Sequence, residues 1–260
     1  DWNCVGPKDF WTNIPSTQLG MGRVNCIAFD NTNSFIYAGS ASGGAWRKGL
    51  SGGSWECITN NIPNLSVSSI CVNPLNPATI YLLTGDGDGN SNSSFGVIVS
   101  YDFGANWYRS GLQWNIPTFV AAYKMLMHPT NPSVLFVASS EGISKSTNGG
   151  ATWSTVQSGR FYDIEFKPGA PATMYASGRG TFYKSTNTGD TWTPITIPGF
   201  AFTGDERTGI AVSSAAPAKV YFISGTVSLP GFNGLWVSTN SGTSWGTGPV
   251  SSASTTKDVF

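Results

Sequence analysis

A short phrase ending in tryptophan recurs along this chain of 260 residues, and it constrains the fold more than any other feature. Four copies are close to one another in sequence, and a fifth is weaker. In chain order they read KGLSGGSW (48–55), SYDFGANW (100–107), STNGGATW (146–153), STNTGDTW (185–192) and STNSGTSW (238–245). Because an active site is normally built once in a protein, a phrase written five times indicates a repeated structural unit. Each copy is called a box below.

Each box closes a unit of similar composition. An apolar segment, a proline-containing turn and a second apolar segment come before it, as in ICVNPLNPATIYLLTG (70–85). Proline cannot donate to the hydrogen bonds of a sheet, so its recurrence between apolar segments marks turns. Four short antiparallel strands in a unit of about 40–50 residues are typical of a β-propeller blade. The sequence therefore predicts an all-β protein with five visible four-stranded blades and no helix longer than a turn.

The predicted blades belong to one propeller domain, 1–260, and cover about residues 20–60, 66–112, 119–157, 160–197 and 205–248. Residues 1–7, DWNCVGP, match the segment SWECITN before the second unit, so we interpret them as a closing strand. The fifth unit already carries its own box. We therefore expect a ring of about six to eight blades that is incomplete at the C-terminus, with further blades or domains of the same polypeptide. The alternative is a complete five-bladed ring with an extra N-terminal strand.

The chemistry of the box residues indicates structural roles. Asp or Asn at the third position can accept hydrogen bonds from the amides of the turn. Glycine at the fifth position adopts a positive φ without steric cost. The tryptophan is expected to pack between neighbouring blades, where its large apolar area contributes most. The residues with these roles are Trp55, Asp102, Gly104, Trp107, Asn148, Gly150, Trp153, Asn187, Gly189, Trp192, Asn240, Gly242 and Trp245.

The boxes resemble the Asp-box, or BNR repeat, of sialidases, sortilin-type receptors and xyloglucanase-type glycoside hydrolases, over residues 20–246. In those families the box lies on the outer rim, between the third and fourth strands and away from the central site. This chain has Asn148, Asn187 and Asn240 where the family usually has Asp, and it keeps Asp102. The Arg-Ile-Pro signature of sialidases is missing, since Arg23 is followed by Val and Asn. The resemblance therefore implies the fold without implying sialidase activity.

The opening segment, GPKDFWTNIPSTQLGMGRVNCIAFD (6–30), resembles the start of repeat proteins that Bacteroidetes secrete, often through the type IX pathway. That resemblance implies an extracellular or cell-surface protein, with any signal peptide absent from this chain. The composition agrees, because only 11% of residues are charged while 13% are aromatic. Neutral chains rich in hydroxyl and aromatic side chains are common among extracellular all-β proteins.

Charge and hydropathy exclude two classes of partner. Fourteen basic and fourteen acidic residues cancel and form no run of either sign, whereas nucleic-acid binding requires a basic stripe. No apolar run approaches the roughly 20 residues of a membrane span. The four cysteines, Cys4, Cys26, Cys57 and Cys71, allow three disulfide pairings or free thiols, and the sequence leaves these open.

Few carboxylates are candidates for chemistry. Asp163 and Glu165 alternate in FYDIEF, so they share one face of a predicted channel-lining strand and could act as acid and base. Asp205 and Glu206 in TGDER would lie near a mouth of the channel. The third group is the pair Asp86 and Asp88 in TGDGDGNSNSS, where carboxylate and carbonyl oxygens could bind calcium; no other cofactor is predicted.

These observations favour a secreted or cell-surface propeller that is not an enzyme and that binds or scaffolds a protein or glycan at one face, because loops on rigid scaffolds carry binding sites. The alternative is a glycoside hydrolase, or another polysaccharide-cleaving enzyme, with a carboxylate pair at the propeller face. Fold alone does not choose between them.

Overall fold

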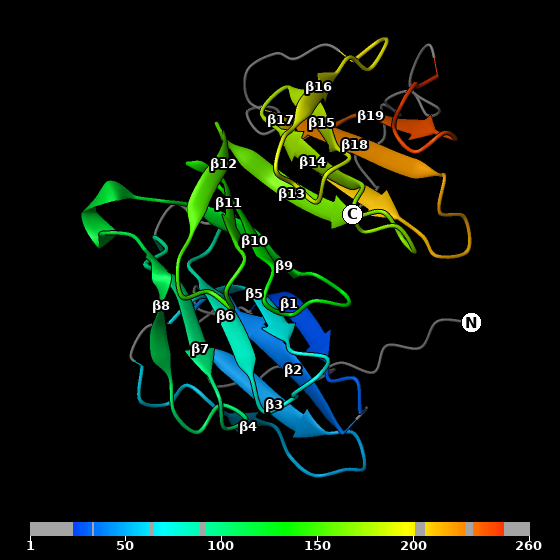
Figure 1. Cartoon of the computed structure of the whole chain (residues 1–260). Coiled ribbons are helices and arrows are strands. Elements are labelled where there is room, and N and C mark those ends of the chain that lie inside the picture. Colours follow the sequence, from blue (N-terminus) through cyan, green and yellow to red (C-terminus); the bar gives the residue numbers. More distant parts are fainter. Residues whose placement is uncertain are drawn as a thin grey trace, which may run out of the picture.

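Five antiparallel sheets make up the computed structural model, which describes residues 23–32, 34–62, 65–88, 92–200, 206–226 and 231–246 (Figure 1). The first sheet contains β1 (Val24–Phe29), β2 (Phe35–Ser40), β3 (Ala45–Gly49) and β4 (Glu56–Cys57). The second contains β5 (Val67–Val72), β6 (Ile80–Thr84), β7 (Gly96–Ser100) and β8 (Tyr108–Gln113). The third contains β9 (Ala122–Met127), β10 (Leu135–Ser139), β11 (Gly142–Ser146) and β12 (Ser154–Ser158). The fourth contains β13 (Phe161–Phe166), β14 (Met174–Gly178), β15 (Thr181–Ser185) and β16 (Thr193–Ile195). The described part of the fifth contains β17 (Glu206–Val212), β18 (Val220–Thr226) and β19 (Gly231–Ser238).

Each sheet is a propeller blade whose strands pair in chain order. The first strands of successive sheets contact one another, β1 with β5, β5 with β9, β9 with β13 and β13 with β17. They are therefore the innermost strands of an arc of blades (Figure 1). The predicted all-β propeller with four-stranded antiparallel blades is confirmed. The helical element of the described residues is the short 3-10 turn η2 (Ile116–Thr118). The number of blades in the complete ring and the blade boundaries stay predictions.

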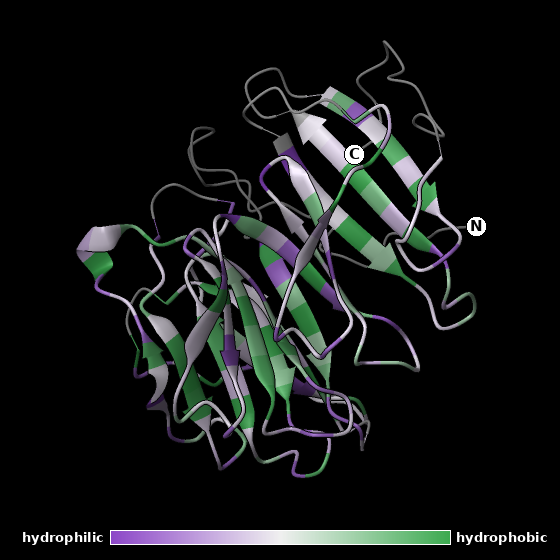
Figure 2. Cartoon of the chain, turned by 45° about the horizontal axis from the view of Figure 1, so that its top comes forward, coloured by the Kyte–Doolittle hydropathy of each residue, from purple (hydrophilic) through white to green (hydrophobic). Residues whose placement is uncertain are grey.

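The core is divided into four apolar clusters, one between each pair of successive sheets. Central strands such as β6, β10 and β14 are buried along their whole length, because both of their faces are covered. Figure 2 shows green, hydrophobic bands across the strands of the blades. This explains why the middle strands of the units are continuous apolar runs, whereas a strand with one solvated face would alternate.

The boxes are hairpins between the third and fourth strands, held by two hydrogen bonds that repeat from blade to blade. In the third blade, the Asn148 Oδ1 atom accepts from the Thr152 amide at 2.9 Å. The Ser146 hydroxyl accepts from the Gly150 amide, also at 2.9 Å. Gly150 has a φ of 82°, as glycine permits. The first contact is the turn bond expected from the sequence, whereas the serine contact is an addition that the sequence analysis missed.

The box tryptophans pack between blades. Trp107, Trp153, Trp192 and Trp245 each join the apolar cluster shared with the preceding sheet. The Trp107 indole also donates to the carbonyl of Ile58 in that sheet, at 2.8 Å. Trp55, in the first sheet, is 43% exposed.

A basic side chain on the third strand reaches from one blade into the box of the next. The Arg47 guanidinium donates to the Phe103 carbonyl at 2.9 Å, and the Lys145 ammonium donates to the Thr188 carbonyl at 2.7 Å. Both acceptors occupy the fourth position of a box. Neighbouring blades are therefore joined by polar contacts at the rim as well as by the apolar clusters.

Several sequence-based predictions concern residues outside the described ranges. These are the closing strand 1–7, the thiol of Cys4 and the side chain of Asp205; Glu206 begins β17, but its side chain is likewise not described. Cys26, Cys57 and Cys71 carry free thiols, so the pairing of Cys4 stays open. Within the described residues, no helix is long and apolar enough to cross a membrane.

Candidate functional site

The innermost strands line a cavity of about 660 Å³ on the channel side of the arc. Four consecutive stretches of chain form its wall, 25–29 of β1, 68–72 of β5, 123–127 of β9 and 162–163 of β13. The β1 side of this channel cavity is apolar, with Ile27 and Phe29 60% and 56% exposed. The side formed by β9 and β13 is polar, because these strands contribute charged and phenolic side chains.

Asp163 and Glu165 meet at a single ammonium group in this region. The Lys124 Nζ atom donates to Asp163 Oδ1 at 2.7 Å and to Glu165 Oε1 at 2.6 Å. The two carboxylate oxygens are therefore no more than about 5.3 Å apart, the sum of the two contacts. The other oxygen of Asp163 accepts from the Ile210 amide of β17 at 2.8 Å. Three blades thus hold the pair, and the two carboxylates share one face of β13 as the alternation predicts.

The protonation of this cluster follows from its burial and from the count of charges. Burial raises the pKa of the Glu165 carboxyl, and this outweighs the lowering by the Lys124 ammonium. For Lys124 itself, burial alone would lower the pKa, but the Asp163 and Glu165 carboxylates outweigh it and hold that pKa above its usual value. Both shifts follow from two carboxylates sharing one cation in a partly buried site: Lys124 holds its proton more tightly, and Glu165 takes up a proton more readily than a free glutamate does.

An arginine and two tyrosines stand beside the channel cavity. The Arg207 guanidinium lies 4.7 Å from the ring centre of Tyr123 and 5.0 Å from that of Tyr162, and the two rings meet edge to face. Its Nη2 atom also forms an ion pair with Asp88 at 2.6 Å. Since Arg207 is on β17 and Asp88 follows β6, the connection between β6 and β7 reaches across to the fifth blade.

The predicted calcium ligands are both held by arginines. Asp86 is buried and pairs with Arg23, while its Oδ1 atom accepts from the Asp88 amide. Asp88 pairs with Arg207. No group of three or more acidic, cysteine or histidine side chains within the described residues has the arrangement of a metal site. A calcium ion would have to displace both arginines, and the calcium site stays a prediction.

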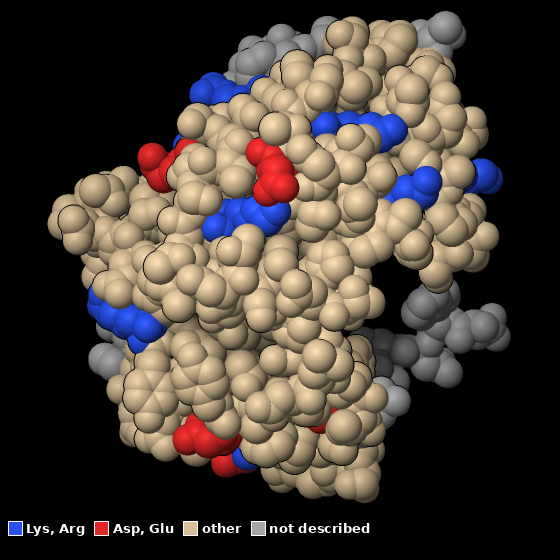
Figure 3. Space-filling model, in the orientation of Figure 1, with Lys and Arg blue, Asp and Glu red and all other residues tan. Residues whose placement is uncertain are grey.

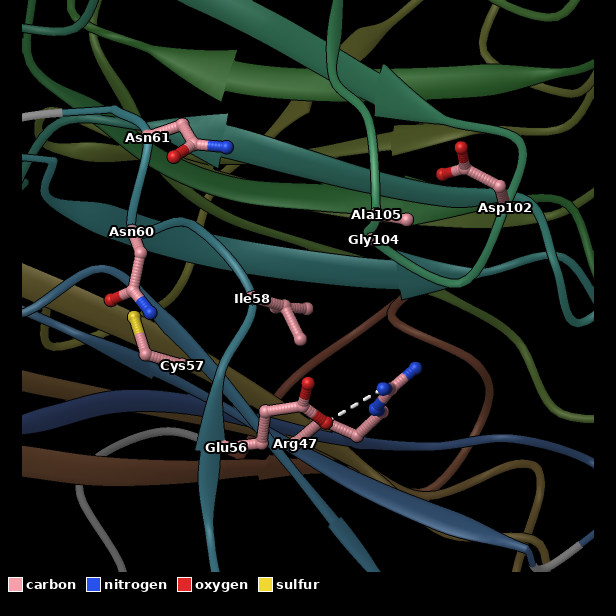
Figure 4. Close-up of a pocket in the computed structure, with 9 residues that line it drawn as sticks. All are labelled: Arg47, Glu56, Cys57, Ile58, Asn60, Asn61, Asp102, Gly104 and Ala105. Carbon is pink, nitrogen blue, oxygen red and sulfur yellow. Dashed lines mark hydrogen bonds and ion pairs between the residues drawn. The ribbon is translucent and has the colours of Figure 1, made fainter.

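A second cavity lies at the box of the second blade, away from the channel (Figure 4). Its volume is about 330 Å³, and it is bordered by Arg47, Glu56 and Asp102 among others. Arg47 and Glu56 form an ion pair at 2.7 Å, while Asp102 is turned to its own hairpin and accepts from the Asn106 amide. Hydrogen bonds from Asn106 lower the pKa of Asp102. This rim cavity is therefore built from scaffold contacts.

Charged side chains are sparse over the molecule. On the face drawn in Figure 3, they form small separate groups among uncharged residues. Lys124 was not among the sequence-based candidates, and neither was Arg207 as a partner of Asp88. The signal that could have found Lys124 is its place on an innermost strand, two residues after Ala122 in a segment that otherwise reads as apolar.

Fold and site together define a β-propeller with a charged cluster at its channel, and three comparisons place it among known proteins. No family model matches the chain. A xyloglucanase of Paenibacillus sp. is 28% identical over 161 residues, which is 57% of this chain and 16% of that enzyme. A xyloglucanase of Hypocrea jecorina is 27% identical over the same share of this chain and 19% of its own length. The chain thus spans less than a fifth of the curated relatives it matches.

Solved structures agree on the fold. The GH74 xyloglucanase of Xanthomonas campestris superposes with a TM-score of 0.66 at 20% identity, over 89% of this chain and 39% of the other. YCF48 of Cyanidioschyzon merolae superposes with a TM-score of 0.56 at 16% identity, over 86% and 70%. At these identities the likeness concerns the fold alone.

The comparisons correct the functional interpretation drawn from the sequence. The expectation of a non-catalytic binding or scaffold module is wrong, because the curated relatives are named xyloglucanases. The scarcity of acids was misleading: a glycosidase needs only two carboxylates, and these need not stand in a recognisable motif. The glycoside hydrolase alternative is the one supported.

Proposed function

We propose that this chain is part of a glycoside hydrolase that cleaves a β-linked polysaccharide of the xyloglucan type. The observation that carries the proposal is the pair Asp163 and Glu165 beside the channel cavity, in a chain whose curated relatives are xyloglucanases. Their nearest oxygens are no more than about 5.3 Å apart, so the two carboxylates lie as close together as the short separation of about 5–5.5 Å in retaining enzymes requires.

The roles follow from the environment of each group. Glu165, whose pKa is raised by burial, is suited to protonate the leaving oxygen as general acid. Asp163 is oriented by the Ile210 amide and is suited to act as the nucleophile or base. Lys124 lies between the two carboxylates and is the positioning residue. When the substrate binds, the Lys124 ammonium must move towards one of the two carboxylates.

The channel cavity also has the surface chemistry that a polysaccharide requires. A pyranose ring has apolar C–H faces and a polar hydroxyl edge, so its site combines apolar surface with a few placed polar groups. The rings of Tyr123 and Tyr162 in its wall offer the first, and the Tyr162 hydroxyl with Asp163 offers the second. Xyloglucan and unbranched β-1,4-glucan are therefore the substrates to test first.

The test is release of reducing ends from xyloglucan by the full-length protein and its variants. Glu165→Gln and Asp163→Asn should each lower kcat by about 10²-fold or more, the usual contribution of such a group. Glu56→Gln, which removes an exposed rim carboxylate, is the matched control and should retain full activity. Full activity of both channel variants would move the chemistry elsewhere, and inactivity of the wild type on every β-glucan would overturn the hydrolase.

The proposal includes further blades and an extracellular location. The face of the first sheet that turns away from the second exposes Val24, Ile27, Phe29 and Trp46, whereas the equivalent faces of the second to fourth sheets are covered by a neighbour. A covering blade would bury these side chains and complete a ring of about six to eight blades.

Secretion, with the type IX pathway as its route, is supported by the opening segment 6–30 and would be tested by locating the protein in the culture medium.

A further inference from the structure

Phe119 is an anomaly among the residues with left-handed backbone. Four residues other than glycine have a positive φ in the described part of the chain, and three of them, Phe103, Thr188 and Ser241, fill the fourth position of a box. Phe119 has a φ of 51° and belongs to no box. Bulky side chains rarely adopt this conformation, and strain of this kind concentrates at functional sites.

The local structure shows how the strain is held. The Phe119 amide donates to the Ile116 carbonyl at the end of η2, at 3.3 Å. The next residue, Val120, is buried and accepts from the Ser94 amide at 2.8 Å. The backbone is thus anchored on both sides while the aromatic ring is left 74% exposed. Phe119 is thus the C-cap of η2, and its ring lies on the surface instead of in the core.

A small cavity lies directly beside this ring. It measures about 160 Å³ and is lined by Phe119, Asp86, Asn92, Ser93, Tyr123 and Arg160. The lining thus combines one exposed aromatic residue with the polar side chains of Asn92, Ser93 and Arg160. The Arg160 guanidinium is positioned by the Tyr123 hydroxyl at 2.7 Å. Tyr123 lines both this cavity and the channel cavity, so the two are neighbours.

We propose that Phe119 and this cavity form an accessory subsite that binds one pyranose ring of a neutral β-linked polysaccharide, apart from the channel carboxylates. The ring of Phe119 would stack on the C–H face of the sugar, and Asn92, Ser93 and Arg160 would bond its hydroxyl edge. The choice of a glycan rests on the proposed function; the existence of a binding site rests on the strained, exposed phenylalanine and its cavity.

The test uses Phe119→Asn in the full-length protein. Asparagine accepts a left-handed backbone more readily than phenylalanine, so this change removes the ring and relieves the strain. We expect affinity for xyloglucan, measured by retardation in native gels and by calorimetry with a soluble oligosaccharide, to fall about tenfold. The melting temperature should be unchanged or higher. A residue with a structural role would show the reverse.

Phe103→Asn is the matched control, because Phe103 is also an exposed phenylalanine with positive φ but lies in a box at the rim. Its sugar affinity should equal that of the wild type.

A measurement of hydrolysis separates this proposal from the proposed function. Phe119→Asn should raise the KM for the polysaccharide and leave kcat on a short chromogenic glycoside unchanged. Sugar binding that needs Phe119 in a protein without hydrolytic activity supports the subsite alone. No sugar binding by the wild type, or equal binding by Phe119→Asn, overturns it.

Discussion

The first and third sheets are built to the same plan and have very different surroundings. In the third sheet β10 is buried along its whole length, while in the first sheet β2 alternates between buried and half-buried residues. On the innermost strands, Ile27 and Phe29 are more than half exposed, whereas Met125 is buried. The two sheets therefore show what a blade gains from a second neighbour.

The difference for these strands lies in packing, since the central strands of the two sheets are hydrogen-bonded in the same way. Both are antiparallel with β2 and β10 paired on both edges. Blade sequences therefore specify a sheet locally and depend on the neighbouring blade for much of the hydrophobic free energy. Four experiments sharpen this contrast, given from the largest expected effect to the smallest.

The largest contrast is expected between Phe136→Ala in β10 and Phe29→Ala in β1. Phe136 is fully buried between the third and fourth sheets, so its truncation should lower the free energy of unfolding by about 3–5 kcal/mol. Phe29 is 56% exposed, and its truncation should cost less than about 1 kcal/mol. Urea unfolding of both variants under identical conditions is the measurement. Equal costs would mean that the first sheet is covered in solution.

A smaller loss is expected from Lys124→Met at the channel. The change leaves two carboxylates without their shared cation, and because the group is 29% exposed we expect about 2–3 kcal/mol, below the value for a fully buried pair. Lys184→Met removes an ammonium at the rim, where the Nζ atom contacts Thr243, and should cost about 1 kcal/mol or less. Chemical denaturation measures the free energy of unfolding of both variants. A larger loss for Lys184→Met than for Lys124→Met would contradict this prediction.

The boxes offer a third contrast, between an intact copy and the weakest one. Ser185→Ala removes the acceptor of the buried Gly189 amide and should cost about 1–2 kcal/mol. Ser51→Ala, in KGLSGGSW, changes an exposed hydroxyl and should stay within about 0.5 kcal/mol. Thermal unfolding measures the change in stability of both variants. A cost at Ser51 equal to that at Ser185 would show that the first box is also held by a serine.

The smallest effect is a dependence on pH. Because the pKa of Glu165 is raised above its ordinary value of 4.5, the folded protein binds this proton more tightly than the unfolded chain. Its contribution to stability is therefore fully present below pH 4.5 and is lost as the pH rises through the folded pKa. Glu165→Gln cannot titrate, so its free energy of unfolding should fall less over that window. Glu56→Gln corrects for the loss of a negative charge, and identical slopes in all three proteins would refute the shift.

Much of the scaffold could be predicted from the sequence because its signals are local. The prolines, glycines and box residues that set each turn lie within a few positions of one another, so STNGGATW alone predicts the contact between Asn148 and Thr152. The all-β fold followed from repeating that signal. The box serine was missed because a hydroxyl at that position is compatible with many turns.

The site could be predicted only in part because its contacts join distant segments. The alternation in FYDIEF placed Asp163 and Glu165 on one face, yet their cation lies 39 and 41 residues earlier, on another blade. Arg207 reaches Gly87 over 120 residues. Pairings across a channel depend on how blades are arranged, and no periodicity within a blade reports them. The function was misjudged for the same reason, since two carboxylates in a neutral chain carry no local signature.

The direction in which the rim contacts run has a consequence for biosynthesis. The Trp107 indole bonds back to the preceding blade, and Arg47 is met by the carbonyl of Phe103, which is translated later. Each new blade therefore leaves the ribosome when the preceding blade, against which it packs, has already been synthesised. Folding can therefore proceed one blade at a time, and each new blade stabilises the one before it. A chain released by a ribosome that stalls midway would already have its earlier blades assembled.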